Sequence, residues 1–411
     1  MAGALKAQIW KKLYKCAASD SKMFARMRHL GSVTILFVLL SFPAAGCRCL
    51  HKEICKHGLS VIDAVAKEEI EEGNVPGAVV LVGQADRILY WRAFGHEVTR
   101  PYKERMHRNT IFDIASLTKP VATAASIMIL VDRKKIKLND YAAAYLPAFT
   151  PSGKDQIQIH HLLTHTSGLP AYTDAGELKK LYGSHCPDEV VRKICDAKLL
   201  SGPGEQFRYS CLGYIILAKI VEVVGEKSID DFAGENIFAP LKMNHTAYNP
   251  PPSWVKGIAA TQIVDGQLLR GTVHDPLARL MGGIAGNAGV FTTAYDLSLY
   301  CRMLLNEGAY RGKTILSPHA VTMLTTVQSH GRAFGFDVDS SYSWPKGSHP
   351  PQTAFCHAGY TGTALVCDPA SKVYIIILTN RVHPDNKGST KPLCRKVADI
   401  VFQTYKDAAA N

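Results

Sequence analysis

The chain has 411 residues, of which 47% are hydrophobic and 20% charged, a composition typical of a globular protein with a large core. Its formal net charge is +12, but residues 1–46 carry seven Lys or Arg against one Asp, which leaves only +6 for the other 365 residues. No stripe of basic residues interleaved with aromatic residues appears in that remainder, which argues against a nucleic-acid partner.

The N-terminal part of the chain has the pattern of a targeting segment. Residues 33–40 are apolar, basic residues precede them, and small residues lead directly into Cys47. A basic region, a short apolar core and a small-residue exit are typical of a secretory signal. The ending at Cys47 resembles a bacterial lipobox, so we expect an exported lipoprotein, periplasmic or on the cell surface, attached to the membrane through lipidated Cys47. The basic region is long, and a start at Met23 or Met27 gives a signal of ordinary length.

Two other interpretations of residues 1–46 stay open, an uncleaved apolar anchor and a basic, acid-poor transit peptide. We treat residues 47–58 as a short linker to the globular part. The eleven cysteines of the chain follow no metal-binding spacing. Export would permit disulfides among them, but the sequence alone does not fix their pairing.

Hydrophobic periodicity predicts strands near both ends of the chain and helices between them. The strands are expected at 77–84, 87–95, 353–359, 363–369 and 372–380, and the clearest helices at 59–72, 212–224, 294–306 and 391–406. Strands that pair across so long a separation imply an α/β (α+β) fold, with an antiparallel sheet built from both chain ends and flanked by helices. We expect one domain over 59–407, with a helical subdomain inserted at about 120–290 and a cleft between the two parts.

The Ser-x-x-Lys motif occurs three times, beginning at Ser19, Ser116 and Ser343. Ser19 lies in the targeting segment and Ser343 in a polar loop, whereas Ser116 follows an apolar stretch and opens the apolar run VATAASIMILV. On a helix, Lys119 would lie beside the Ser116 hydroxyl and, held in a dry site, could accept its proton. The helix N-terminus also offers N–H groups to developing negative charge. By itself the motif fits a plain helix cap and a solvated lysine at least as well.

Two further segments carry groups suited to proton transfer and substrate binding. Tyr209 precedes an apolar helix, and a tyrosine whose pKa is lowered by a nearby ammonium could relay protons to the leaving group. His357 lies on an expected strand before Gly359, where a glycine leaves room for substrate along the backbone. Taken singly, a tyrosine that enters an apolar helix is usually a core residue, and a strand histidine is usually structural.

The order and spacing of these segments resemble the serine β-lactamase and DD-peptidase superfamily, in particular its class C β-lactamase-related branch, which includes esterases and D-aminopeptidase-like hydrolases. The resemblance runs from about residue 60 to 405 and rests on IFDIASLTKP, IHHLLTHTSGLP, PGEQFRYSCLGY, LKMNHTAY, GGIAGNAGVFTTAYDL and CHAGYTGT. It implies a β-lactamase-like fold. It also implies that Ser116 is acylated, that Lys119 is the general base and that Tyr209 relays protons. The backbone N–H groups of Ser116 and Tyr360 would form the oxyanion hole.

Two positions depart from the pattern of the superfamily. Cys211 stands where the second motif usually has Asn, and a thiol is a poor substitute for an amide in substrate recognition. His357 stands where penicillin-binding members usually have Lys, as is common in the esterase and peptidase branch. We therefore expect penicillins to be poor substrates, with residual activity on anionic substrates rising as the pH falls toward about 6.

The sequence thus predicts an exported serine hydrolase that forms an acyl-enzyme at Ser116. Its expected substrate is a small molecule or peptide: a D-amino-acid peptide, a cell-wall fragment or a small ester, with no cofactor. The alternative is a weakly active or degenerate penicillin-binding protein that holds peptidoglycan. Cys211 is the feature that favours this alternative.

Three other features have structural interpretations beside the functional ones. His160, His161 and His165 lack a matching carboxylate or an HExxH pattern, so we expect no metal. The glycine-rich stretch 282–289 lacks the strand–loop–Lys context of a phosphate-binding loop. The His-Asp pair at 274–275 lies in a loop that could also line the cleft.

Overall fold

The computed structural model describes residues 58–410, with side chains described up to residue 407. The expected signal segment, Cys47 and all of the expected linker except Gly58 lie outside the described residues, so the lipoprotein remains a prediction. Seven cysteines fall within the described residues, all as free thiols: Cys186, Cys195, Cys211, Cys301, Cys356, Cys367 and Cys394. Disulfides therefore do not contribute to the part of the fold that is described.

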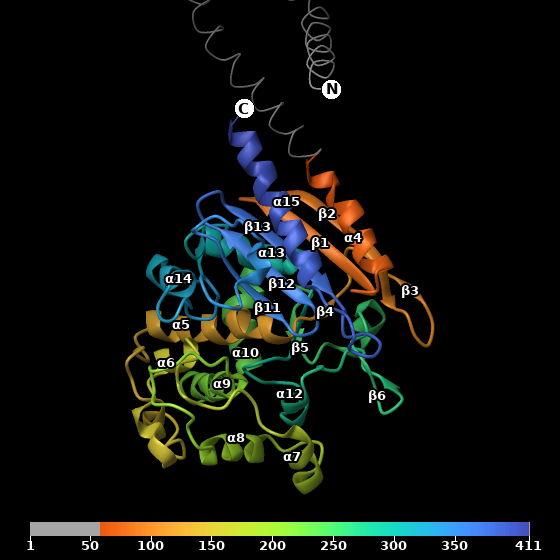
Figure 1. Cartoon of the computed structure of the whole chain (residues 1–411). Helices are drawn as coiled ribbons and strands as arrows, with labels where there is room; N and C mark the ends of the chain where they lie inside the picture. The colour runs from red at the N-terminus through yellow and green to blue at the C-terminus, as the bar shows by residue number, and fades with distance from the viewer. Residues whose placement is uncertain (1–57, 411) are drawn as a thin grey trace, which may run out of the picture. The chain divides into compact units, whose positions relative to one another are not determined.

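The centre of the fold is a six-stranded antiparallel sheet in the order β11-β12-β13-β1-β2-β3 (Figure 1). Strand β1 pairs with β13 from Ala78 opposite Thr379 to Gln84 opposite Val373, so the two chain ends join in one sheet. The strands are β1 Gly77–Gln84, β2 Arg87–Val98, β3 Glu104–Arg105, β11 Phe355–Gly359, β12 Thr363–Asp368 and β13 Val373–Thr379. The predicted fold class is confirmed, and the five predicted strands are all present.

Alternate strand residues point to opposite sides of the sheet, so apolar strand residues face both sides. Helices and core residues cover both of these faces. On one face Val80 of β1 packs in a cluster with apolar residues of α4 (Ile62–Glu71) and α15 (Lys391–Ala410). These two helices contact each other and lie over the sheet in Figure 1. On the other face Val79 and Leu81 belong to the larger core, which the central helices share.

The chain between the terminal strands is mainly helical and supplies Ser116, Lys119 and Tyr209 of the candidate site. A small three-stranded sheet, β4-β8-β5, lies in this part. Helices α9 and α13 begin and end within one residue of their predicted bounds. The elements are β4 Phe112–Asp113, α5 Ala125–Asp132, α6 Ile159–Leu163, α7 Ala175–Tyr182, α8 Pro187–Asp196, α9 Cys211–Gly225, α10 Ile229–Ala233, α11 Ala239–Leu241, β5 Ala247–Tyr248, β6 Ile263–Val264, β7 Gln267–Leu268, α12 Pro276–Leu280, β8 Val290–Thr292, α13 Ala294–Leu305, β9 Ala309–Tyr310, β10 Lys313–Thr314 and α14 Pro318–Thr325.

The segment around Ser116 differs from the continuous helix that the sequence suggested. Ser116 lies in a 3₁₀ turn, Ala115–Leu117, and a π-helical turn, Lys119–Ala124, follows before α5 begins. Pro120 has no amide hydrogen, so it cannot donate to the carbonyl four residues earlier as a regular α-helix requires. The stretch Ala115–Asp132 is long and apolar enough to cross a membrane, but 83% of it is buried within the fold, as expected of a core helix.

Candidate active site

The backbone just before Ser116 adopts an uncommon conformation. Ala115 has a φ of 45°, a left-handed value that costs energy for a residue other than glycine. The carboxylate of Asp113 stabilises this turn, because it accepts the Ala115 N–H at 2.8 Å and the His274 N–H at 2.6 Å. Burial raises the pKa of Asp113 to about 6, although the two amides lower it. A buried carboxylate therefore fixes the turn that carries Ser116.

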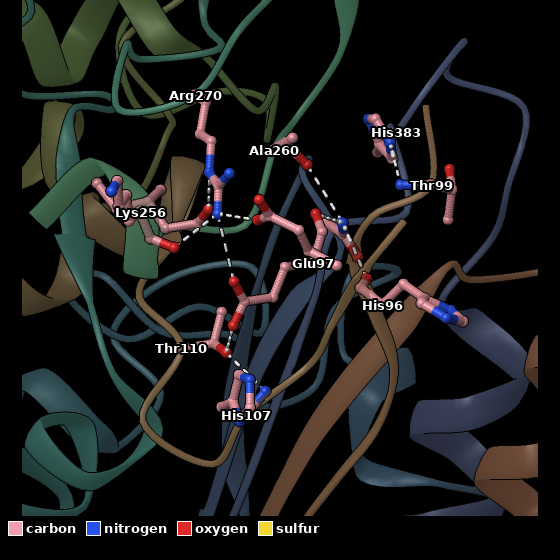
Figure 2. Close-up of polar contacts among 12 residues, drawn as sticks. His96, Glu97, Thr99, His107, Thr110, Lys256, Ala260, Arg270 and His383 are labelled. Atoms are coloured by element: carbon pink, nitrogen blue, oxygen red, sulfur yellow. Dashed lines mark hydrogen bonds and ion pairs between the residues drawn. The ribbon is translucent and has the colours of Figure 1, made fainter. Parts of the chain in front are cut away.

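A second buried carboxylate, that of Glu97, holds the chain a few residues upstream (Figure 2). The Thr110 hydroxyl donates to Glu97, and the Arg270 guanidinium lies 3.4 Å from it. Burial raises the pKa of Glu97, whereas Thr110 and Arg270 lower it. Ile111, the residue after Thr110, donates its N–H to the Gly257 carbonyl at 2.8 Å. These bonds tie the strand that leads into the turn to the segment around residue 257.

Strand β11 lies directly against this turn because Gly359 has no side chain. A Cβ atom on Gly359 would meet the Ile114 carbonyl oxygen at 2.3 Å and Thr363 Oγ1 at 2.2 Å. The Thr363 hydroxyl donates to the same carbonyl at 3.0 Å. The space beside Gly359 is thus filled by the protein itself, and the close approach places Ser116 and Tyr360 on the wall of one cavity.

Ser116 and Lys119 lie within hydrogen-bonding distance, as their spacing predicts. Lys119 Nζ donates to Ser116 Oγ at 2.9 Å and to the Asn287 carbonyl oxygen at 2.9 Å, and it contacts Cys211 Sγ at 3.5 Å. The Lys119 side chain is fully buried, whereas Ser116 reaches the cavity. This is the geometry of a nucleophile next to its proton acceptor.

Two opposing effects act on the pKa of Lys119. Burial lowers this pKa, whereas negative charge on Cys211 and Tyr209 would raise it above its ordinary value. Burial raises the pKa of the Cys211 thiol and of the Tyr209 phenol, so both groups are neutral near pH 7. Charges on Cys211, Tyr209 and Asp275 together raise the pKa of Lys119. With Cys211 and Tyr209 neutral, only the weaker effect of Asp275 and the Tyr209 hydrogen bond oppose desolvation, which favours the free amine that a general base requires.

Tyr209 lines the cavity between the basic side chains of Lys119 and Arg332, and its pKa is raised rather than lowered. Lys119 Nζ lies 5.1 Å and the Arg332 guanidinium carbon 5.7 Å from the centroid of the Tyr209 ring. Desolvation raises the pKa of Tyr209, and the positive charge of Lys119 offsets this only in part. The expectation of a lowered pKa is therefore wrong, because burial outweighs the ammonium. Tyr209 is therefore a neutral phenol near pH 7.

His357 lines the cavity from β11 as a neutral ring. It is 1% exposed, and neither ring nitrogen has a hydrogen-bond partner among the described residues. Burial lowers its pKa well below the ordinary value of 6.5, and the charges of Arg332 and Lys119 lower it further. A fall in pH toward about 6 therefore does not charge this histidine. The expected gain of activity on anionic substrates over that range loses its physical basis.

A cavity of about 310 Å³ joins residues from the turn, the central helices and the sheet edge. Of the residues proposed from the sequence, its walls contain Ser116, Tyr209, His357, Gly359 and Tyr360, while Lys119 and Cys211 lie behind the first two. Sequence reasoning missed the remaining polar and aromatic lining residues, which are Asp337, Tyr342, Trp344, Arg381, Ser389, Thr390 and Lys391. Apart from Trp344 in a short 3₁₀ helix and Lys391 at the start of α15, they come from loops, where periodicity carries no information.

Two of the missed residues are cations that rest on aromatic rings at the cavity. Lys391 Nζ lies 5.7 Å from the centroid of the Trp344 ring, and the Arg381 guanidinium carbon lies 4.5 Å from that of Tyr360. The Tyr360 ring also stacks on His274 with centroids 5.7 Å apart. The rim of the cavity is thus positively charged and aromatic. Of the His-Asp pair at 274–275, His274 contacts this rim through Tyr360.

The other histidines and the pair at 274–275 have structural partners. His161 and His165 each accept a backbone N–H at 3.1 Å, and His165 also stacks on Tyr209 with centroids 4.3 Å apart. Asp275 caps α12 by accepting the Ala278 N–H at 2.8 Å. Within the described part of the chain, no three metal-ligating side chains lie together.

Known proteins match this chain over most of its length. The sequence profile of the β-lactamase family matches residues 62–398. The N-acetylmuramyl-L-alanine amidase of Bacillus subtilis (strain 168) is 31% identical over 361 residues, which cover 79% of this chain and 81% of that protein. An Escherichia coli (strain K12) protein named D-alanyl-D-alanine carboxypeptidase is 28% identical over 361 residues, which cover 79% of this chain and 82% of that protein.

Solved structures share the fold. EstCE1, described as a hydrolase with promiscuous acyltransferase activity, superposes with a TM-score of 0.69 at 24% identity, covering 85% of this chain and 100% of that one. A penicillin-binding protein homolog from Caulobacter crescentus gives a TM-score of 0.69 at 18% identity, covering 84% of this chain and 97% of that one. The arrangement of sheet and helices is therefore common to this chain and these two proteins.

Proposed function

The chain belongs to the β-lactamase family of hydrolases, and we propose that it forms an acyl-enzyme at Ser116. The observation that carries this proposal is the buried Lys119 Nζ, 2.9 Å from Ser116 Oγ at the wall of a cavity. A serine hydroxyl becomes a good nucleophile when a neighbouring group takes its proton, and Lys119 is within reach to do so.

Each side chain has a role in the proposed reaction. Lys119, as a free amine, accepts the proton of Ser116 while Oγ attacks the substrate carbonyl. Tyr209, a neutral phenol, gives a proton to the leaving group as the scissile bond breaks. The backbone N–H groups of Ser116 and Tyr360 stabilise the oxyanion in this scheme. Water then attacks the acyl-enzyme with Lys119 again as the base, and Ser116 is released.

The proposed substrate is a D-amino-acid peptide, a cell-wall fragment or a small ester. The names of the amidase and carboxypeptidase relatives support an amide bond in cell-wall material. Aromatic rings of Tyr209, Tyr342 and Trp344 line the cavity and favour a substrate with apolar surface. The neutral ring of His357 disfavours reliance on a substrate carboxylate at that wall.

A degenerate family member, which binds peptidoglycan or is acylated without turnover, is the second candidate. Cys211 favours it, because a thiol that donates and accepts weakly stands where the superfamily usually has an amide. The thiol lies 3.5 Å from Lys119 Nζ and so belongs to the site. The hydrogen bond between Ser116 and Lys119, which turnover requires, favours the first candidate.

Purified protein, incubated with D-Ala-D-Ala peptides, p-nitrophenyl esters and a chromogenic cephalosporin, distinguishes the two candidates. We expect multiple turnovers of a peptide or an ester and little turnover of the cephalosporin. Release of a single equivalent of product, with a stable acyl-enzyme in the mass spectrum, would favour the degenerate member. Absence of both turnover and labelling by a serine-directed fluorophosphonate would overturn the acyl-enzyme itself.

We also propose that the protein is exported and anchored by a lipid on Cys47. The support is the basic, apolar and small-residue pattern that ends at Cys47. A substrate from the cell wall would agree with this location. Mass spectrometry of the protein from its native cell should find a chain that starts at lipidated Cys47. Intact residues 1–46, or an unmodified Cys47 at a soluble N-terminus, would contradict the proposal.

A further inference from the structure

Arg332 is a buried cation directly behind the site. Its side chain is 0% exposed and forms an ion pair with Asp337, which lines the cavity. Its Nε and Nη2 atoms have no hydrogen-bond partner among the described residues. A charge that is buried with unpaired donors is costly, so its presence at this point calls for another interaction that compensates it.

Two aromatic rings supply that interaction. The guanidinium carbon of Arg332 lies 5.7 Å from the centroid of the Tyr209 ring and 5.8 Å from that of Phe207. A guanidinium group near a ring is attracted by the electrons of that ring. Phe207 has no titratable group, whereas a fixed positive charge beside Tyr209 also favours the ionised form of its hydroxyl. The chemical consequence of the charge therefore falls on Tyr209.

The other groups around Tyr209 do not provide a permanent positive charge. The titratable and charged neighbours, besides Arg332, are Lys119, Cys211, His165, His357, Tyr214, Tyr342 and, paired with Arg332, Asp337. Burial lowers the pKa of both histidines well below the ordinary value, so these two rings are neutral. Lys119 is positive only while it holds the proton that it takes from Ser116.

The charge of Lys119 is therefore transient, because Lys119 must give that proton up again, whereas Arg332 stays positive throughout the reaction. We propose that Arg332 is a positioning residue whose permanent charge stabilises the negative charge that Tyr209 acquires when it protonates the leaving group. The O–H bond of Tyr209 breaks as the new N–H or O–H bond of the leaving group forms. The proton that Lys119 took from Ser116 then returns to Tyr209, so the proton count balances. This inference rests on the proposed acyl-enzyme function.

Two substrates with the same acyl group and different leaving groups separate this role from a structural one. A D-alanine p-nitroanilide releases an amine that must be protonated, whereas a D-alanine p-nitrophenyl ester releases a phenolate that leaves without a proton. A weaker acid at Tyr209 should slow the amide and leave the ester nearly unchanged. The measured quantity is the ratio of kcat/KM for the amide to kcat/KM for the ester, which misfolding alone does not change.

The double variant Arg332→Met/Asp337→Asn removes both charges of the buried pair. We expect it to lower the amide-to-ester ratio on the order of tenfold, the scale of a weakened general acid. Arg332→Lys keeps the charge and should keep the ratio. The matched control is Arg302→Met, because Arg302 lies 6.0 Å from the Tyr374 ring outside the site, and this variant should also keep the ratio.

A folded double variant with an unchanged ratio would overturn the inference. If the double variant does not fold, Asp337→Asn still tests it, because the loss of the counter-charge leaves the positive charge of Arg332 uncompensated beside Tyr209. Asp337→Asn should raise the ratio, and a fall would overturn the inference. If the unaltered protein hydrolyses neither substrate, the proposed function fails. If the protein is active but its amide-to-ester ratio does not depend on Arg332, the proposed function stands and only the role of Arg332 is overturned.

Discussion

The two walls of the site present titratable side chains in very different states. On the wall formed by the turn and α9, Lys119 Nζ contacts Ser116, Cys211 and the Asn287 carbonyl. On the β11 wall, His357 is equally buried, but neither of its ring nitrogens has a partner among the described residues. Buried polar groups are normally paired. The first wall is therefore arranged for proton transfer in the free protein. The His357 nitrogens of the second wall are available for hydrogen bonds to substrate or water.

Replacement of the nucleophile should cause the largest loss of activity at the first wall. Ser116→Ala should reduce turnover by at least about 10⁴-fold and abolish labelling by a fluorophosphonate, because no other group can form the acyl-enzyme. The matched control is Ser343→Ala, which alters a serine with the same Ser-x-x-Lys spacing. Ser343 Oγ accepts the Ser340 N–H at 3.0 Å in a loop, so that variant should still be labelled. Unchanged turnover in Ser116→Ala would end the hypothesis.

Lys119→Met separates the chemistry of the first wall from its stability. We expect kcat/KM to fall on the order of 10²–10⁴-fold, as the loss of a general base predicts. The melting temperature should stay level or rise, because an apolar side chain replaces a fully buried polar side chain. Lys154→Met is the control, since Lys154 is also fully buried but donates to the Ala197 carbonyl at 2.7 Å. A parallel loss of stability and rate in Lys119→Met would point to a structural lysine.

The residues of both walls were largely predictable from the sequence, but their electrostatic states and part of their backbone geometry were not. Ser116, Lys119 and Tyr209 lie in motifs whose spacing fixes their order, and short apolar runs were clear enough to place β1, β11 and β13. The sequence did not reveal that Tyr209 is desolvated enough to raise its pKa, because burial depends on residues far away in the chain. The π-helical turn at Lys119–Ala124 was also missed, since hydrophobic periodicity does not distinguish it from an α-helix.

Arg332 and Asp113 show which signal was available and overlooked. Each is a charged residue inside an apolar stretch, Arg332 in GRAFGFD and Asp113 in IFDIAS. A charge in such a place is expensive unless it is paired, and both are paired in the structure, Arg332 with Asp337 and Asp113 with backbone amides. Asp337 and Ala115 lie only a few residues from the charges that they pair with, and His274 lies in a loop. No periodic pattern in the sequence therefore marks these partners.

Asp113→Asn measures how much the buried carboxyl group of Asp113 contributes to the free energy of unfolding. Burial raises the pKa of Asp113 from 3.8 to about 6. A raised carboxyl pKa contributes stability below the lower value and loses it as the pH rises through the higher one, by up to about 3 kcal/mol. The free energy of unfolding of the wild type minus that of Asp113→Asn should therefore fall between about pH 4 and pH 6. Denaturant titrations across this range measure the difference, and a flat difference would contradict the buried ionisation.

Penicillin turnover tests the second wall and carries the smallest expected effect. Every penicillin has a carboxylate, and a charge-assisted hydrogen bond to it is roughly twice as strong as a neutral one. Because His357 is neutral, the loss of that charge should weaken binding on the order of 1 kcal/mol. Penicillins should therefore be turned over more slowly than a good ester or D-peptide. No gain specific to anionic substrates is expected between about pH 7.5 and pH 6, since the pKa of His357 lies well below that range.

His357→Lys combined with Cys211→Asn should raise penicillin turnover relative to ester turnover by up to about tenfold, the effect of about 1.4 kcal/mol. The new lysine would stand near Arg332 and Lys119, both of which act on His357 in the present protein, so their repulsion should lower its pKa. The gain should therefore be largest at the acidic end of the active range, where that lysine is charged. Neither change alters Ser116, so the ester rate serves as the internal standard. A wild-type kcat/KM for penicillin near roughly 10⁷–10⁸ M⁻¹s⁻¹ would contradict this explanation, because penicillin would then not be a poor substrate.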